Sequence, residues 1–204
     1  MNGHERRAAA TREALKDALL QLLCKKPFSE VTIAALCREA KVGRATFYTH
    51  YTGLTDVVDD VAEDAIAGTA KMSASSPISG IVTLAEKMRN TTDPKALEPY
   101  MSLLPICQRV ADNPKYRILF TDDFLSEYIL MYIYRHEKDH VIPTLTSTYH
   151  ISEEEADKLF LYNIHGAYAV NRLMNWNKDE AWYNVQKVLL TFQEGGYSSL
   201  AKLR

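Results

Sequence analysis

Apolar side chains recur at helical spacing throughout the first third of the chain. In residues 8–24 they repeat at intervals of three and four positions, which predicts an amphipathic helix. A shorter stripe occupies 32–40, and a polar and aromatic segment follows at 44–51. A further stripe runs over 54–72 and carries acidic residues, which we interpret as a solvated face. The pattern therefore predicts four helices of unequal length.

The rest of the chain keeps a helical pattern without alternating runs long enough to form a sheet. The small, polar stretch 72–80 contains a proline and is the expected loop between two parts of the chain. Two long helices are predicted near the end, over 153–175 and 178–200. A Ser or Asn followed three residues later by Glu predicts a capping box at the start of each. These pairs are Ser152 with Glu155 and Asn177 with Glu180.

Composition agrees with an all-α globular protein. The chain has 204 residues, of which 47% are hydrophobic and 25% charged, so one large or two small domains are both compatible with it. The three cysteines, Cys24, Cys37 and Cys107, lack the number and spacing of a disulfide framework or a zinc site. We therefore expect a reducing, cytoplasmic environment. Neither a signal peptide nor a membrane-spanning segment is indicated.

Charge is distributed unevenly along the chain. Residues 1–53 hold nine Lys or Arg against five Asp or Glu, a net charge of +4, whereas the remainder holds 15 against 21. A basic head on an acidic body favours a polyanionic partner for the head, such as nucleic acid. A solvated basic face would give the same count.

The segment 32–51 has the pattern of a helix-turn-helix motif, in which a turn at residues 41–43 joins two short helices. Phe47 and Tyr51 are four residues apart, so we expect both to pack against the first helix, near Leu36 and Ala40. The opposite arc is polar enough to enter a major groove, where Arg can bond guanine and Thr can meet a thymine methyl. That arc presents Ala45, Thr46, Tyr48 and Thr49, with Arg44 and His50 at its flanks.

The run AKVGRATFYTHY at residues 40–51 resembles the recognition segment of the TetR/AcrR family of bacterial transcriptional regulators, and the resemblance covers about residues 8–65. It implies an N-terminal three-helix DNA-binding domain, 1–53, and a larger helical ligand-binding and dimerisation domain, 54–204. Residues 54–72 would form the connecting helix. The implied function is a sequence-specific regulator, a repressor that a small-molecule effector releases from its operator.

The resemblance also assigns roles to matching positions. Thr32 would cap the first motif helix and touch a phosphate, Tyr48 and His50 would lie near phosphates, and Thr46 would contact phosphate or base. The positions that read bases are Arg44, Ala45 and Thr49.

Three positions depart from the family pattern. Lys41 replaces a frequent glycine and Gly43 replaces a polar N-cap, which would loosen the turn and the cap. Leu54 replaces a phosphate-binding lysine. We therefore expect fewer base contacts than usual, but not the loss of the site.

The body is rich in tyrosine, which suits either a pocket for an amphipathic molecule or a tight helical core. Helical spacing indicates a cavity between residues 124–132 and 160–168, in which Phe160 and Asn163 would also take part. The expected ligand-binding residues are Tyr128, Tyr132, His165 and Tyr168.

The expected assembly is a homodimer that binds an inverted repeat in double-stranded DNA, since one short recognition helix buries too little of the duplex. The resemblance implies that the last two helices form the interface, although an internal core would have the same pattern. The expected interface members are Tyr162, Ala169, Leu173, Trp182, Val185, Leu189 and Phe192.

No motif for catalysis, metal binding or a cofactor is present in the sequence, so we do not expect an enzyme. The alternative function is a helical protein-interaction module whose basic head binds an acidic partner. Sequence-selective binding of duplexes would separate the two.

Overall fold

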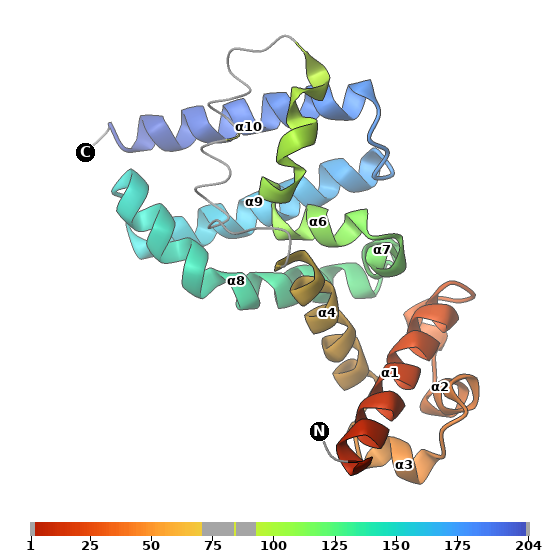
Figure 1. Cartoon of the computed structure of the whole chain (residues 1–204). Helices are drawn as coiled ribbons and strands as arrows, with labels where there is room; N and C mark the ends of the chain where they lie inside the picture. The colour runs from red at the N-terminus through yellow and green to blue at the C-terminus, as the bar shows by residue number, and fades with distance from the viewer. Residues whose placement is uncertain (1–2, 71–83, 85–92, 203–204) are drawn as a thin grey trace. The chain divides into compact units, whose positions relative to one another are not determined.

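The computed structural model of the chain describes residues 3–70, 84 and 93–202, and these contain helices but no β-strand (Figure 1). The all-α fold expected from the sequence is thus confirmed for the described residues. The expected loop at 72–80 lies outside them. The α-helices are α1 Gly3–Leu23, α2 Ile33–Ala40, α3 Arg44–Tyr48, α4 Leu54–Ala70, α6 Ile106–Asp112, α7 Pro114–Thr121, α8 Leu125–Tyr149, α9 Glu153–Leu173 and α10 Glu180–Leu200, and the 3-10 segments are η1 Phe28–Glu30 and η2 Pro94–Leu103.

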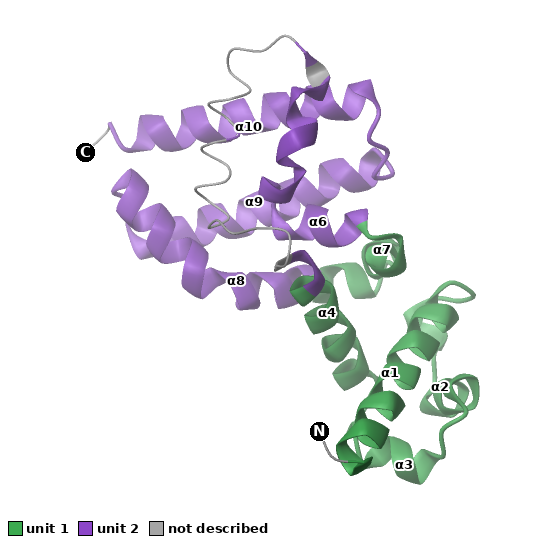
Figure 2. Ribbon diagram, viewed as in Figure 1, with its two compact units in different colours: residues 1–67, 113–129 green, residues 68–112, 130–204 purple. Residues whose placement is uncertain are grey.

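The contacts divide the chain into two compact units (Figure 2). Unit 1 comprises residues 1–67 and 113–129, and unit 2 comprises 68–112 and 130–204. Unit 1 therefore contains a middle segment of the chain that the expected domain 1–53 does not include. Both α4 and α8 begin in unit 1 and end in unit 2.

Unit 1 is built around α1, which packs against α2 and α7. The apolar stripe of α1 is buried, as its three- and four-residue spacing predicts, although the helix begins at Gly3, earlier than expected. The side chains with no exposed surface at the centre of this unit come from five helices. They are Leu15, Leu19, Leu36, Phe47, Val57, Val58 and Leu119.

Unit 2 contains two apolar clusters. One gathers the end of α8 with α9 and α10, and includes Val141, Leu145 and Tyr197. The other joins η2 to α10 and includes Leu97 and Trp182. The chain's two tryptophans, at 176 and 182, both belong to this unit, so tryptophan fluorescence reports on unit 2 alone.

The last two helices test the expected capping boxes. At α9 the box is confirmed, since the Ser152 hydroxyl accepts from Glu155 N at 3.2 Å and the Glu155 carboxylate accepts from Ser152 N at 2.8 Å. The box at Asn177 is wrong. Asp179 caps α10 instead and accepts from Trp182 N at 2.9 Å, so the helix begins two residues later than expected.

Candidate nucleic-acid interface

The helix-turn-helix motif consists of α2, a tight turn and α3. The Thr32 hydroxyl accepts from Ala35 N at 3.2 Å, which confirms Thr32 as the N-cap of α2. Gly43 precedes α3 with no side-chain cap, in keeping with the departure noted in the sequence. Its φ of −68° is open to any residue, so no glycine-specific backbone conformation is required there.

Lys41 sets the angle of the turn. Its φ of 55° and ψ of 37° lie in the left-handed region. Lys41 N donates to Arg38 O at 3.2 Å, and Val42 N donates to Cys37 O at 2.9 Å, which together form a Schellman motif at the end of α2. The turn is therefore closed by hydrogen bonds, with a lysine at the position that glycine favours.

We expect Lys41→Gly to stabilise unit 1 by about 1 kcal/mol. A side chain in the left-handed region costs about 1–2 kcal/mol, and glycine removes that strain. Part of the gain is offset because glycine increases the conformational entropy of the unfolded chain. Lys41→Ala removes the charge but keeps the strain, and should leave stability nearly unchanged. Urea-dependent hydrogen exchange of the α1 and α2 amides measures both variants. Equal stability of the Gly and Ala variants would contradict the strain argument.

The recognition helix α3 presents the expected polar surface. Arg44, Ala45, Thr46 and Thr49 are exposed, and Tyr48 is 59% exposed. The helix ends at Tyr48 rather than at residue 51, so the last two site positions lie in the turn that follows. There the Thr49 hydroxyl donates to Thr46 O at 2.7 Å, and the half-buried His50 donates its backbone N–H to Phe47 O at 2.9 Å. Contact of these side chains with DNA stays a prediction.

The opposite side of α3 holds the motif to the core. Phe47 is fully buried and Tyr51 nearly so, which confirms that both are core residues. Their rings lie 5.8 Å apart, centre to centre. One face of α3 therefore anchors the helix in the core, and the other face is open to solvent.

Eight of the nine positive charges of the head fall into two groups, and the ninth, Lys26, donates to Glu30 O at 2.7 Å. Arg12, Lys16 and Lys25 form ion pairs within unit 1, Lys25 with Glu39 at 2.8 Å. Five others are exposed and have no carboxylate partner among the described residues. They are Arg6, Arg7, Arg38, Lys41 and Arg44. The charge available to a polyanion is thus concentrated at the start of α1 and around the turn and α3.

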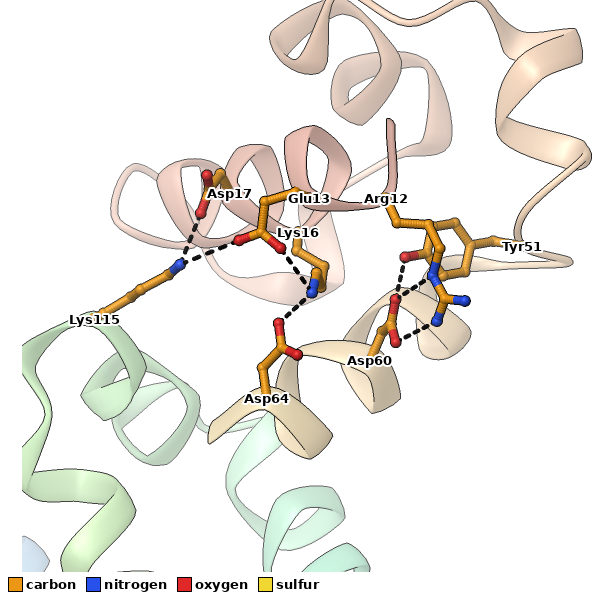
Figure 3. A network of polar contacts seen from close by, with 8 residues as sticks. All are labelled: Arg12, Glu13, Lys16, Asp17, Tyr51, Asp60, Asp64 and Lys115. Atoms are coloured by element: carbon orange, nitrogen blue, oxygen red, sulfur yellow. Dashed lines mark hydrogen bonds and ion pairs between the residues drawn. The ribbon is translucent and has the colours of Figure 1, made fainter. Parts of the chain in front are cut away.

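A polar network connects α1 to α4 and to Tyr51, the last residue of the motif (Figure 3). The Arg12 guanidinium donates to the Asp60 carboxylate at 2.9 and 2.5 Å, and the Tyr51 hydroxyl donates to the same carboxylate at 2.5 Å. Arg12 also lies 5.7 Å from the centre of the Tyr51 ring. Asp60 therefore links α1, α4 and the segment after α3.

The same face of α1 carries further ion pairs. Lys16 pairs with Glu13 at 2.9 Å and with Asp64, while Lys115 at the start of α7 pairs with Asp17 at 2.9 Å (Figure 3). Elsewhere on α4 the Asp59 carboxylate accepts from the Tyr128 hydroxyl at 2.6 Å. The expectation of a solvated acidic face on α4 is therefore wrong, because these carboxylates have partners on helices distant in sequence.

We expect the Asp60 contacts to make the stability of unit 1 depend on pH. Burial acts to raise the pKa of Asp60, but the hydrogen bonds from Arg12 and Tyr51 and the nearby positive charges outweigh it and lower the pKa below its usual value. A lowered folded pKa stabilises the fold above the unfolded pKa of about 3.9, and that contribution is lost as pH falls through the folded pKa. Asp60→Asn should accordingly be less stable than the parent at pH 7, with a gap that narrows below pH 4. Hydrogen exchange of the α1 amides at pH 7 and below pH 4 measures the difference in stability between the two proteins. A difference that is the same at both pH values would contradict the role given to Asp60.

The Asp122 carboxylate connects the segment before α2 to the start of α8. This contact was not expected from the sequence. Its buried carboxylate accepts from Phe28 N at 2.8 Å, from Phe124 N at 3.0 Å and from Leu125 N at 2.9 Å. It thereby caps the start of α8 and fixes the segment that precedes α2. An Asp before a helix does indicate a cap. Its hydrogen bond from Phe28, 94 positions away, could not be inferred from the neighbouring sequence.

The expected ligand-binding residues are divided between the two units, and their role in ligand binding stays a prediction. Tyr128 belongs to unit 1, whereas Tyr132, His165 and Tyr168 belong to unit 2. His165 Nδ1 lies 3.0 Å from Leu161 O, and the Tyr168 hydroxyl accepts from Arg172 at 2.8 Å. None of the four lines the apolar cavity of unit 2 described next.

Unit 2 does contain an enclosed apolar cavity of about 60 Å³. Phe160 and Asn163 line it, but its other walls come from α6, the second half of α8 and α10 and not from the expected residues 124–132. Its polar groups include the buried Glu137 carboxylate and the Cys107 thiol. Burial raises the pKa of Cys107 to about 12, so this thiol is protonated at neutral pH.

The expected dimer-interface residues differ in exposure. Tyr162, Leu173 and Phe192 are large apolar side chains that remain exposed in one chain. Trp182 does not belong with them, because it is buried and its indole N–H donates to Asn171 Oδ1 at 2.7 Å. The assignment of Trp182 to an interface is therefore wrong, since a buried indole needs an internal hydrogen-bond partner and has one.

The described part of the chain contains no group of three or more His, Cys, Asp or Glu arranged to hold a metal ion. None of its helices is both long and apolar enough to cross a bilayer.

Comparison with known proteins gives a partial similarity to a regulator. No family model matches the chain. Sixty-four residues are 34% identical to the uncharacterized HTH-type transcriptional regulator YxbF of Bacillus subtilis (strain 168). The match spans 31% of this chain and 17% of that protein's length.

Proposed function

We propose that this chain is a cytoplasmic, sequence-specific DNA-binding transcriptional regulator of the TetR/AcrR type. The observation that carries the proposal is the surface of α3, where Arg44, Thr46 and Tyr48 are exposed while Phe47 is buried. A helix anchored in this way can enter a major groove with its polar side toward the bases. The partial similarity to a protein described as an HTH-type transcriptional regulator supports the same general class.

The distribution of charge supports DNA as the partner. Within residues 3–53, the exposed basic side chains without carboxylate partners lie at the start of α1 and around the turn and α3, while Arg12 and Lys16 form ion pairs with α4. Exposed cations next to a recognition helix supply contacts to phosphate, which position the protein without selecting sequence. The base contacts are proposed to come from Arg44, Ala45 and Thr49.

The proposed regulator is a homodimer on an inverted repeat. Exposed Tyr162, Leu173 and Phe192 on α9 and α10 are the side chains that a second copy would cover. A two-fold dimer places its recognition helices on half-sites about 34–36 Å apart or a multiple of that distance. In this proposal a small-molecule effector in unit 2 changes that separation through α4 and so releases the operator.

Selection of bound duplexes from a random pool by the full chain, at physiological salt, tests the proposal without a known promoter or effector. Enrichment of an inverted repeat is the expected outcome. If the protein is folded but nothing is enriched, the proposal fails and a basic head that binds an acidic protein becomes the better account. If no effector changes the affinity for the operator, only the proposed release mechanism fails, and the proposal of DNA binding stands.

A further inference from the structure

The enclosed cavity of unit 2 has one carboxylate in a mostly apolar wall. The wall is formed by side chains of α6, α8, α9 and α10 and by Pro105, and Glu137 on α8 is the acidic or basic residue among those described there. Glu137 is buried, but 11% of its side chain remains accessible. The side chains that a second copy would cover in the proposed dimer are not part of this wall. They are Tyr162, Leu173 and Phe192.

Three polar side chains of the wall use one another as hydrogen-bond partners. Asn163 Nδ2 donates to the Tyr197 hydroxyl. Gln193 Nε2 donates to Asn163 Oδ1 at 3.2 Å. If the Asn163 amide is rotated by 180°, its oxygen accepts from Tyr197 and its nitrogen donates to Gln193, so the three remain paired with one another in either orientation.

Glu137 differs from these groups because it has hydrogen-bonding capacity left. Its Oε1 lies 2.9 Å from Nδ1 of the neighbouring His136. Its Oε2 has no hydrogen-bond partner among the described residues, whereas a carboxylate has about four acceptor positions. A water molecule beside Oε2 would be surrounded mainly by apolar side chains, and buried waters make about three hydrogen bonds. An apolar molecule with a single donor therefore suits this place better than water.

The charges around the cavity decide which kind of donor fits. Burial lowers the pKa of Arg109 on α6, and the charge of Glu137 acts against that shift, so the two ions share one region of unit 2. Arg109 Nη1 donates to Thr69 O at 3.0 Å and not to Glu137. The guanidinium thus balances the carboxylate without occupying its oxygens. A charged ligand would leave a net charge away from water, which is costly, so the fitting group is a neutral donor.

The size of the cavity limits the rest of the ligand. Its volume of about 60 Å³ is less than half that of an engineered cavity of ~150 Å³ in another protein, which binds benzene. It is also well below the ~300–1,000 Å³ of pockets for drug-sized ligands. The occupant therefore has only a few heavy atoms.

We propose that this cavity binds a small, neutral molecule with a short apolar body and one hydroxyl group, which donates its hydrogen bond to the Glu137 carboxylate. That this molecule is the effector rests on the proposed function. The binding itself does not, because it involves unit 2 alone and can be measured without DNA.

Four probes with the same branched skeleton test the site, namely 2-propanol, acetone, isopropylammonium and acetate. At pH 7 the alcohol is a neutral donor, acetone is neutral but only accepts, and the other two are ions. Titration of the full chain, followed by the methyl NMR signals of Val141 and Leu145 in the cavity wall, measures each affinity. We expect 2-propanol to bind about tenfold or more tightly than each of the others, because it alone supplies a donor without adding a charge.

Two results of the titration would overturn the proposal. In the first, acetone or either ion binds as tightly as 2-propanol, which means that the carboxylate does not select the ligand. In the second, none of the four probes shifts the methyl signals, which means that water fills the cavity or that the cavity stays closed to solutes.

A double variant tests the role of the carboxylate. Glu137→Leu/Arg109→Leu removes both ions together and so leaves neither of them buried alone. It should bind 2-propanol and acetone with equal affinity. Asp139→Leu removes a carboxylate from an exposed position of the same helix and should keep the preference for the alcohol. If the double variant also keeps it, Glu137 is not the acceptor and the proposal is wrong.

A cavity-filling variant tests the location. Val141→Phe places a larger side chain in the wall and should abolish binding of 2-propanol, with Leu145 as the remaining reporter. Tryptophan fluorescence shows whether unit 2 is folded in each variant. Binding that persists in folded Val141→Phe would place the alcohol elsewhere and overturn the proposal.

Duplex selection separates this proposal from the proposed function. An enriched operator without binding of 2-propanol rejects the cavity site and leaves the regulator intact. Selective binding of 2-propanol without an enriched operator supports the cavity site and rejects the regulator.

Discussion

Replacing Arg44 with alanine is expected to weaken binding to the selected operator by about 1–3 kcal/mol and to relax selectivity at one base position in each half-site. Arg44 is exposed at the first position of α3, and the described residues hold no carboxylate that competes for it. A guanidinium placed there can bond guanine O6 and N7 together, a contact that no other base offers. Binding of each single-base operator variant by the parent and the Arg44→Ala protein measures the effect.

Tyr48→Phe is the matched control for this experiment. Tyr48 lies on the same exposed face, but its expected partner is a phosphate, so the variant should weaken binding to all duplexes to a similar degree. A loss of affinity confined to one base position in Arg44→Ala, beside a uniform loss in Tyr48→Phe, identifies Arg44 as a residue that reads a base. If Arg44→Ala behaves like Tyr48→Phe, Arg44 contacts the backbone, and selectivity must come from Thr49 or from the arm with Arg6 and Arg7.

Asp122→Ala is expected to destabilise unit 1 by about 2–4 kcal/mol, although it lies outside the helix-turn-helix motif. The substitution removes the cap of α8 and leaves the buried N–H of Phe28 without an acceptor. Hydrogen exchange should show lower protection in α1 and α2, while tryptophan fluorescence follows unit 2 separately.

The neighbouring aspartate provides the control for Asp122. Asp123 is exposed, and Asp123→Ala should change stability by less than about 1 kcal/mol. Comparable losses in the two variants would mean that the local charge, rather than the three buried hydrogen bonds, stabilises this segment.

Features that depend on neighbouring residues could be predicted from the sequence. Thr32 and Ser152 act as caps because the partner N–H is only three residues away. Phe47 could be assigned to the core because its face of the helix follows from the 3.6-residue period. At α10 the same local argument failed, because Asn177 and Asp179 are both residue types that cap helices and the sequence alone does not choose between them.

Features that depend on distant residues could not be predicted. Asp60 reads as one of several exposed carboxylates until α1 brings Arg12 beside it. Trp182 matches an interface pattern, and its buried bond to Asn171 becomes apparent only in the folded unit. The cavity of unit 2 likewise involves α6 and α10, whose approach to α9 has no counterpart in helical spacing.

The composition of unit 1 has a consequence for synthesis of the protein. Its helices come from two stretches of chain, 1–67 and 113–129, which the ribosome delivers some distance apart in time. The α1 and α2 helices can form as they emerge, but Lys115 and Asp122 reach them only after the intervening residues have been made. The recognition helix therefore obtains its full support late in translation, and a head released at residue 70 would lack α7 and the cap of α8.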